Sequence, residues 1–533
     1  MQNFKKYTYT MKNIKLKIRF LLLLSVLWIV SACSEDFLNR PPEDSVALDN
    51  FYSSEEELIA NANVLYGTVW FNFNTKAFWS ITELTGGNAR SFSGDVINFG
   101  NFTVSGDNTV LTDGWESLWG VVAQSNAIIN FVPDRVSGAV PQEAVDNVVG
   151  EAHFMRATAY FYLVRIWGAV PIIENNLNNV YDPQIPTNRV EDVYELIERD
   201  LQYAIDNCYD KTRGGNYDAN VHVSSGSAKA LKAKVHLYQE EYEEARQLAE
   251  EVINSGEFKL FGIDLPSMSY ADLFLTENNN NEESIAQMQW STQGYGVGNA
   301  MQASFAFSSQ ITATGDGYGV IGPTIDLQEA YEDGDERRKA TIMLADDFYP
   351  NILSSEGGFT VPDDINAQNT KAAIKKYVVG TPEDNGGEGA AQAAPNNTYI
   401  MRYADVLLIH AEAILAGQES TSNQAALNSF NTIRERAGLG SLPSITLEDI
   451  LHERRVEFAI EGDYWFDLGR IDRQMAIEII SNQERGTYSN DTPPEVYSQM
   501  FTPSAEDFTM PYPSSDVALN PLLLEEPQPY EFN

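Results

Sequence analysis

Three glutamates, Glu453, Glu457 and Glu461, recur at steps of four residues and are candidates for acid–base chemistry. Steps of four place side chains on one face of a helix, and paired carboxylates can hydrolyse a glycosidic bond. Arginines surround them, on the same segment and on neighbouring predicted helices: Arg402, Arg434, Arg436, Arg454 and Arg455. Because an arginine holds a carboxylate through two hydrogen bonds, we predict a structural ion-pair network here and no enzymatic activity.

The sequence predicts no metal site and no cofactor. The five histidines include no pair with a zinc-ligand spacing such as His-Glu-x-x-His. No Gly-x-Ser-x-Gly nucleophile motif is present. Cys208 follows a predicted helix, where we expect a buried structural thiol and not a nucleophile.

The N-terminus has the pattern of a secretory signal peptide over residues 1–32. Basic residues precede an apolar run at 20–30, which small residues follow. This run is too short to span a bilayer, which takes about 20 residues. The cysteine after Val-Ser-Ala resembles a bacterial lipobox, which implies cleavage before Cys33 and its modification with acyl chains such as palmitate. Residues 33–50 are then expected to be a tether between lipid and fold.

Acidic residues dominate the composition. The full chain has 35 basic and 76 acidic residues, and residues 1–32 hold six of the basic ones, which leaves the mature chain at −47. Such a surface repels nucleic acid and anionic headgroups, and it weighs against a highly anionic polymer as ligand. If Cys33 is lipidated, Cys208 is left alone and no disulfide can form, so stability must come from a large core.

The segments that must position these side chains are helical, because their apolar residues recur at steps of three and four. Gly168 ends the first of them, a turn at 239–241 joins the third and fourth, and Gly256 and Gly438 close later ones. Neighbouring helices of this length form pairs like tetratricopeptide units. We therefore predict a mainly α fold with a superhelical scaffold of helix pairs. The predicted helical segments are 152–166, 193–207, 228–238, 245–253, 403–414 and 427–433.

Two stretches, 71–114 and about 260–400, lack helical periodicity and are rich in Gly, Asn, Ser, Thr and aromatic residues. Long irregular stretches on a rigid scaffold commonly carry binding sites. We expect an N-terminal helical region at 51–260 and a C-terminal region at 261–533, with loop insertions and closing helices.

Several motifs together resemble the SusD/RagB family of outer-membrane lipoproteins from Bacteroidetes. They occur in family order over nearly all of the mature chain. Asp463 departs from the family pattern, in which a basic residue is common at that position. The matching segments are 33–38 (CSEDFL), 150–157 (GEAHFMRA), 167–171 (WGAVP), 402–413 (RYADVLLIHAEA), 431–438 (NTIRERAG), 453–458 (ERRVEF), 465–468 (WFDL) and 510–513 (MPYP).

The resemblance implies four tetratricopeptide-like helix pairs and a loop-rich ligand region. It also implies a lipid-anchored outer-membrane protein that faces the cell exterior. Such a protein lies over a SusC-like TonB-dependent transporter and hands a nutrient to it, usually a glycan and less often a peptide.

Aromatic residues mixed with hydrogen-bonding residues are the best candidates for the ligand site. Sugar rings pack their C–H faces on aromatic rings, and their hydroxyls need polar partners. In the family, ligand residues commonly come from two zones, here 71–102 and 287–318. The candidates are Trp79, Asn88, Arg90, Phe92, Asp95, Trp290, Tyr295 and Tyr318.

We therefore expect a cell-surface protein that captures an oligo- or polysaccharide and delivers it to its transporter. Three alternatives remain open at this point. The ligand is a peptide, or the protein is a structural lid with no ligand of its own, or Glu457 belongs to a glycosidase. The sequence does not identify the sugar, its linkage or its length.

Overall fold

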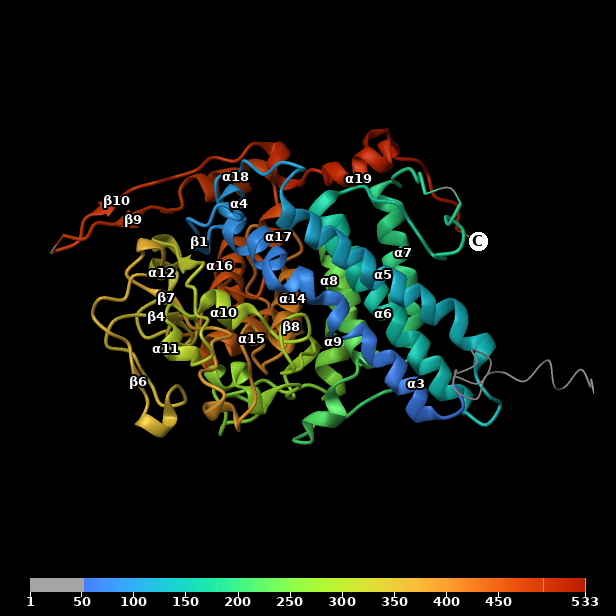
Figure 1. The fold of residues 1–533 in the computed structure, drawn as a ribbon, viewed down its shortest axis with the longest axis horizontal. Helices are drawn as coiled ribbons and strands as arrows, with labels where there is room; N and C mark the ends of the chain where they lie inside the picture. Colours follow the sequence, from blue (N-terminus) through green and yellow to red (C-terminus); the bar gives the residue numbers. More distant parts are fainter. Residues whose placement is uncertain (1–51, 182, 492, 533) are drawn as a thin grey trace, which may run out of the picture.

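The computed structural model describes residues 52–181, 183–491 and 493–532. The predicted signal peptide, tether and lipidation site Cys33 lie outside the described residues. In Figure 1 the long helices gather on the right of the molecule, and the irregular segments with the short strands gather on the left. The fold is mainly α, as predicted.

The N-terminal helices form a series in which each long helix packs against the next in sequence. α6 ends where Gly168, at φ +71°, donates its N–H to Val164 O. α8 and α9 form the predicted helix pair, and Gly256 follows α9 at φ +67°. The helices of this series are α5 (Thr109–Arg135), α6 (Gln142–Trp167), α7 (Val190–Asn207), α8 (Ser225–Tyr238) and α9 (Tyr242–Ser255), and the shorter α3 (Glu55–Ala62) packs against α6.

The C-terminal helices continue this scaffold, because α14 packs against both α8 and α9 as well as α15. They are α14 (Tyr403–Leu415), α15 (Gln424–Arg436), α16 (Leu447–Phe458), α17 (Tyr464–Arg470) and α18 (Arg473–Ser481). The irregular segments contain short helices, which are α4 (Ile97–Gly100), α10 (Met301–Phe305), α11 (Ser309–Thr312), α12 (Ile325–Ala330), α13 (Arg337–Thr341) and α19 (Ser514–Leu519).

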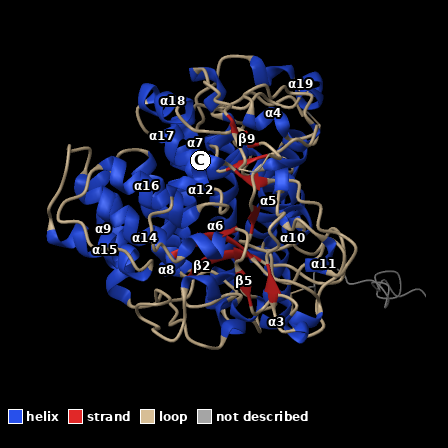
Figure 2. Cartoon of the chain, turned by 90° about the vertical axis from the view of Figure 1, so that its left-hand side faces the viewer, coloured by secondary structure: helices blue, strands red, loops and turns tan. Residues whose placement is uncertain are grey.

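The described strands form five antiparallel pairs, which are small in Figure 2 beside the helices and loops. Only β2 (Ser284–Met288) and β8 (Thr398–Arg402) exceed two residues, and this pair connects the loop-rich part to the start of α14. The other pairs are β1 (Ala89–Arg90) with β3 (Gly322–Pro323), β4 (Ile342–Met343) with β7 (Ala373–Ile374), β5 (Phe348–Tyr349) with β6 (Phe359–Thr360), and β9 (Thr487–Tyr488) with β10 (Val496–Tyr497).

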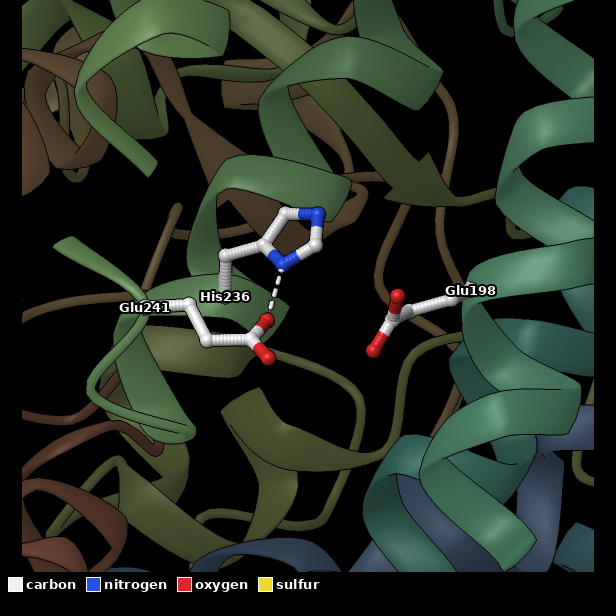
Figure 3. Close-up of side chains that lie close together, drawn as sticks. All are labelled: Glu198, His236 and Glu241. Carbon is white, nitrogen blue, oxygen red and sulfur yellow. Dashed lines mark hydrogen bonds and ion pairs between the residues drawn. The ribbon is translucent and has the colours of Figure 1, made fainter. Parts of the chain in front are cut away.

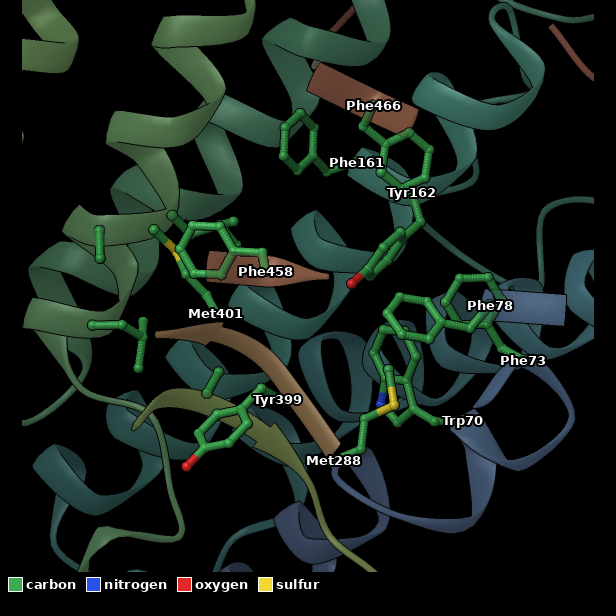
Figure 4. Packing of buried hydrophobic residues seen from close by; sticks show 14 of the residues in the cluster. Trp70, Phe73, Phe78, Phe161, Tyr162, Met288, Tyr399, Met401, Phe458 and Phe466 are labelled. Carbon is green, nitrogen blue, oxygen red and sulfur yellow. The ribbon is translucent and has the colours of Figure 1, made fainter. Parts of the chain in front are cut away.

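One large buried cluster connects the scaffold to the irregular segments. In Figure 4, Tyr162 of α6 lies among Trp70, Phe73 and Phe78 of the N-terminal segment and Phe466 of α17. The ring centroids of Tyr162 and Phe73 are 5.0 Å apart, and those of Tyr162 and Phe466 are 6.1 Å apart. Offset and edge contacts of this kind add to the free energy gained by burying the rings. The core therefore joins segments some 400 residues apart in sequence.

The predicted helices are confirmed, and each observed helix is longer than its apolar pattern or matches it. Cys208 is buried at the end of α7, as predicted. The stretch 71–114, predicted to be irregular, is wrong in two places. Residues 109–114 begin α5, and residues 71–86 form an irregular helix. Two π-helical stretches, Phe73–Ala77 and Ser80–Leu84, interrupt it. A π-helix bonds residue i to i+5, so its apolar residues do not recur at the α-helical period.

The predicted ion-pair network is confirmed, and Glu457 lies at its centre. Its carboxylate contacts Arg436 of α15, Arg402 of β8 at 2.9 Å and Arg337 of α13 at 3.2 Å. Arg402 also contacts Glu461 at 2.6 Å. Glu457 and all three arginines are buried.

Glu461 does not share the helix face that we predicted for it. α16 ends at Phe458, so only Glu453 and Glu457 are helical, and Glu461 lies in the following turn. It still joins the network, through Arg402 and through Lys376 at 2.8 Å.

The network makes stability depend on pH through Glu457. Burial raises the pKa of this carboxyl, but Arg436, Arg402 and Arg337 together lower it below its ordinary value of 4.5. The folded chain therefore binds this proton less readily than the unfolded chain does. The stability that the carboxylate confers is complete above about pH 4.5 and is lost as the pH falls further.

We predict that Glu457→Gln lowers the free energy of unfolding at pH 7 by about 3–5 kcal/mol, because it leaves buried arginines without a partner. Urea unfolding between pH 3 and 8 should also show a shallower acid slope for this variant than for the wild type. Glu506→Gln, at an exposed position, is the matched control and should leave both quantities unchanged. An unaltered urea midpoint for Glu457→Gln would contradict the structural role.

Candidate ligand-binding site

The predicted ligand residues divide into exposed and buried groups. Phe92, Tyr295 and Tyr318 are 51%, 64% and 58% exposed. Arg90, Asp95 and Trp290 are partly exposed. Trp79 and Asn88 are completely buried. Because the exposed rings all belong to the irregular segments, these segments can offer aromatic surfaces to a ligand.

The pairing of β1 with β3 brings Arg90, Phe92 and Tyr318 to one place. Arg90 lies opposite Gly322, and the next residue, Ser91, donates its hydroxyl to Val320 O at 2.6 Å. Phe92 thus follows β1, and Tyr318 precedes its partner strand β3. We call this group, together with Asp95, the β1–β3 site.

Gln368 bridges the two sides of the β1–β3 site. Its side-chain oxygen accepts the N–H of Phe92 at 2.7 Å, and its amide nitrogen donates to Gly319 O at 2.5 Å. Gln368 has a left-handed backbone with φ +50°, a conformation that is uncommon outside glycine and often marks a functional turn. Sequence reasoning missed this residue, since nothing in its neighbourhood shows that it reaches segments 276 and 49 positions away.

A second aromatic group, which we call the Phe71 cluster, contains Phe71, Trp290 and Tyr295. The ring of Phe71 meets Tyr295 edge-on with centroids 4.9 Å apart, and it meets Trp290 at 6.3 Å. Trp290 donates its indole N–H to Thr398 Oγ1 at 3.0 Å, which fixes the ring against β8. Tyr295 is therefore an exposed ring on a rigid base.

The irregular helix at 71–86 links the two groups. Phe71 begins it, and Lys76 on its next turn forms an ion pair with Asp95 of the β1–β3 site. The Phe71 cluster and the β1–β3 site are thus both in contact with this one helix. Lys76 was not predicted from sequence.

Trp79 and Asn88 need correction as ligand residues, because the structure places both in the core. Trp79 donates to Thr75 O at 2.8 Å and packs on Phe305. Asn88 donates to Glu83 at 3.0 Å and accepts from Arg455 at 2.9 Å. With no exposed surface, neither side chain can touch a ligand in this conformation. Asn88 instead links the irregular helix to α16 of the scaffold, and Trp79 packs this helix against α10.

The β1–β3 site contains both signs of charge. The guanidinium of Arg90 lies over the ring of Phe92, 4.5 Å from its centroid. Burial lowers the pKa of Arg90 to about 10, against the opposing effect of Glu484, so the side chain is charged at neutral pH. Burial raises the pKa of Asp95, but Lys76 and Ser93 lower it below its ordinary value.

A possible metal-ligand group lies elsewhere, on the scaffold, where Glu198, His236 and Glu241 bring ligand atoms within 4.8 Å of one another (Figure 3). His236 Nδ1 is 2.5 Å from the Glu241 carboxylate, and Gln239 donates to Glu198 at 2.7 Å. These bonds join α7 to the turn between α8 and α9. We therefore assign the group to helix packing.

Comparison with known proteins agrees with the fold. A family model described as "SusD family" matches residues 282–528, and one described as "Starch-binding associating with outer membrane" matches residues 36–237. A SusD-like protein of Bacteroides ovatus is 36% identical over 98% of this chain and all of its own length.

Solved structures resemble the chain over most of its length. A crystal structure with xylogluco-oligosaccharide has 34% sequence identity and a TM-score of 0.80, and covers 89% of this chain and 99% of its own. A laminarin-binding SusD-like protein has 25% identity and a TM-score of 0.70, and covers 88% and 98%.

Fold and site together define a helical binding protein that presents aromatic rings from its irregular segments. The chain belongs to the SusD family. In the described part of the chain, no helix is both long and apolar enough to span a bilayer.

We predict that replacing the buried Trp79 by alanine destabilises the protein much more than replacing the exposed Tyr295 by alanine. Trp79→Ala should lower the free energy of unfolding by about 3–5 kcal/mol, because it leaves a cavity in the core. Tyr295→Ala should change it by less than about 0.5 kcal/mol. Urea unfolding of both variants measures this difference, and equal effects would show that the two rings are misassigned.

Proposed function

We propose that the protein captures a glycan at the cell surface and delivers it to a SusC-like TonB-dependent transporter. The observation that carries this proposal is the pair of aromatic groups in the loop-rich part of the chain, each next to hydrogen-bonding side chains. Tyr295 and Tyr318 offer flat apolar surfaces, and Arg90, Asp95 and Lys76 lie within reach of sugar hydroxyls. Several weak contacts of this kind suit a ligand that must be released to a second protein.

The relatives support a carbohydrate ligand. The structure with a xylogluco-oligosaccharide and the laminarin-binding protein share the fold over nearly their whole length. Their ligands differ, so the family resemblance supports the class of ligand and leaves the particular glycan open.

The proposed location is the outer membrane, with a lipid anchor at Cys33 and the fold on the exterior. The description of one matching family model names association with the outer membrane. The lipobox pattern before Cys33 supports the anchor, since acyl chains hold a protein at a bilayer by about 0.8 kcal/mol per buried methylene.

We infer binding without bond cleavage. Glu453, Glu457 and Glu461 are at most 8% exposed, and arginines or Lys376 occupy their carboxylates. A glycosidase needs a carboxyl group at the glycosidic oxygen, which these three side chains cannot reach through the packed core.

Two alternatives stay within the family. A peptide ligand would need exposed strand edges or charge complementarity, and a lid without a ligand would need only a surface for the transporter. Neither alternative explains why aromatic rings gather beside polar side chains on the loop-rich face. We therefore favour the glycan.

The proposal predicts that residues 34–533 are retarded by a polysaccharide in affinity electrophoresis. Tyr295→Ala and Tyr318→Ala should each weaken the interaction roughly tenfold, about 1.4 kcal/mol, because each removes a stacking surface. Tyr181→Ala is the control, since Tyr181 is 99% exposed and lies outside both aromatic groups.

The outcomes separate the alternatives. Retardation that survives in both tyrosine variants would place the glycan elsewhere on the molecule. No retardation by any plant, microbial or host polysaccharide, with co-purification of a TonB-dependent barrel from membranes, would favour the lid. Saturable binding of peptides but not oligosaccharides would favour the peptide ligand.

The anchor is tested by metabolic labelling of the full chain with palmitate in its bacterial host. We expect label and membrane association in the wild type, and loss of both in Cys33→Ala. Cys208→Ala should keep both, because this thiol is buried in the fold. Protease accessibility on intact cells then reports whether the protein faces outward, and label retained by Cys33→Ala would refute the anchor.

A further inference from the structure

A small open cavity lies beside β1, within the β1–β3 site. Its volume is about 80 Å³, several times the roughly 10–15 Å³ that one water needs. It opens beside the half-exposed ring of Phe92. Two arginines, Arg90 and Arg485, line it, and no acidic residue is among the described residues of its wall. This is notable in a chain with twice as many acidic as basic residues.

Arg485 contributes a buried positive charge without a carboxylate partner. It is 3% exposed, and in the described structure its guanidinium donates hydrogen bonds to neutral oxygens. These are Gln483 Oε1 at 2.6 Å and the carbonyls of Leu84, Thr85 and Gly100 at 3.0–3.2 Å. Burial and the neighbouring Arg455 lower its pKa to about 9. Since a buried charge is costly without an opposite charge, an anion in the cavity is favoured.

Arg90 contributes donors without acceptors. Its Nε and Nη1 atoms are buried and have no hydrogen-bond partner. Leaving a buried donor unsatisfied costs roughly 1–3 kcal/mol. Its guanidinium has the planar fork that matches a carboxylate or sulfate through two hydrogen bonds. Because this guanidinium covers one face of Phe92 and the ring is still half-exposed, the rest of the ring is open to a ligand.

The nearby acidic groups do not occupy these arginines. The carboxylate of Glu484 accepts the N–H groups of Gly486 at 2.7 Å and Gln499 at 2.9 Å, and the hydroxyl of Ser498 at 2.5 Å. Asp326 pairs with Arg455 at 2.6 Å. The cavity therefore keeps a local positive charge within a strongly acidic protein.

We propose that this cavity binds an anionic substituent of the glycan, either the carboxylate of a uronic acid or a sulfate ester, with the sugar ring placed against Phe92. This inference rests on the proposed function. It also refines the class of glycan, because the net negative charge of the whole chain repels a densely charged polymer. A mostly neutral polysaccharide with occasional acidic side groups satisfies both conditions.

The first test uses small probes on residues 34–533. Methyl β-glucuronide and glucose 6-sulfate should raise the melting temperature in a thermal-shift assay, whereas methyl β-glucoside should not. Arg90→Gln should abolish the shift, and Arg90→Lys should keep part of it. Arg199→Gln is the matched control, because Arg199 also lies 4.5 Å from the centre of an aromatic ring, that of Phe532, and should retain the full shift.

The second test uses a polymer and its neutralised form. Glucuronoxylan and carboxyl-reduced glucuronoxylan are compared in affinity electrophoresis, and so are a sparsely sulfated galactan and its desulfated form. Acidic forms should bind roughly tenfold more tightly, about 1.4 kcal/mol. In Arg90→Gln the ratio of acidic to neutral affinity should fall to about one, whatever the effect of this variant on the binding of the neutral forms.

Several outcomes would overturn the proposal. Equal binding of acidic and neutral forms would do so, as would discrimination that persists in Arg90→Gln. Stabilisation by inorganic sulfate equal to that by glucose 6-sulfate would indicate a simple anion site without a sugar. Binding of neutral glycans alone would retain the proposed function and reject the acidic subsite. An Arg90-dependent glucuronide shift without binding of any polysaccharide would instead retain the cavity's ligand and reject glycan capture.

Discussion

The ion pairs around Glu457 are the constraint on which the rest of the structure depends. Removing such charges from water costs several kcal/mol per ion, and only well-placed partners compensate for it. The partners of Glu457 come from α13, β8 and α15, and those of Glu461 from β8 and the segment before β8. Each partner has to stay in position for the others to remain paired. The network thereby fixes the irregular segments to the helical scaffold at their base.

This fixed base explains how irregular segments can present ordered side chains. β8 carries Arg402 at one end and, at the other, Thr398, which holds the indole of Trp290. The Phe71 cluster is thus connected to the buried charges through Trp290, Thr398 and the strand β8. The β1–β3 site is tied down differently, through Gln368 and the strand pair. Exposed aromatic rings are useful for stacking only when their backbone is held in this way, since ordering a loop on binding would cost conformational entropy.

Sequence patterns predicted the scaffold well. A helix with one buried face has apolar residues at every third or fourth position, and this period can be seen in a single sequence. They also predicted the ion pairs, from the spacing of Glu453 and Glu457 among arginines. They did not separate Trp79 from Trp290, since residue type alone does not say which ring faces the core. The role of Gln368 was out of reach, because it depends on contacts between residues far apart in sequence. Lys76 and Phe71 were missed because the π-helical stretches lack the α-helical period, so the sequence did not show which helix face these residues belong to.

The π-helical stretches at Phe73–Ala77 and Ser80–Leu84 have a consequence for how such proteins diverge. Each π turn accommodates one more residue than an α turn between the same two ends. Losing that residue would restore an α-helix while the ends stay anchored, and would rotate the intervening side chains by about 100°. Insertion or deletion of a single residue in these turns would therefore change which side chains face outward while the two ends of the helix stay in place.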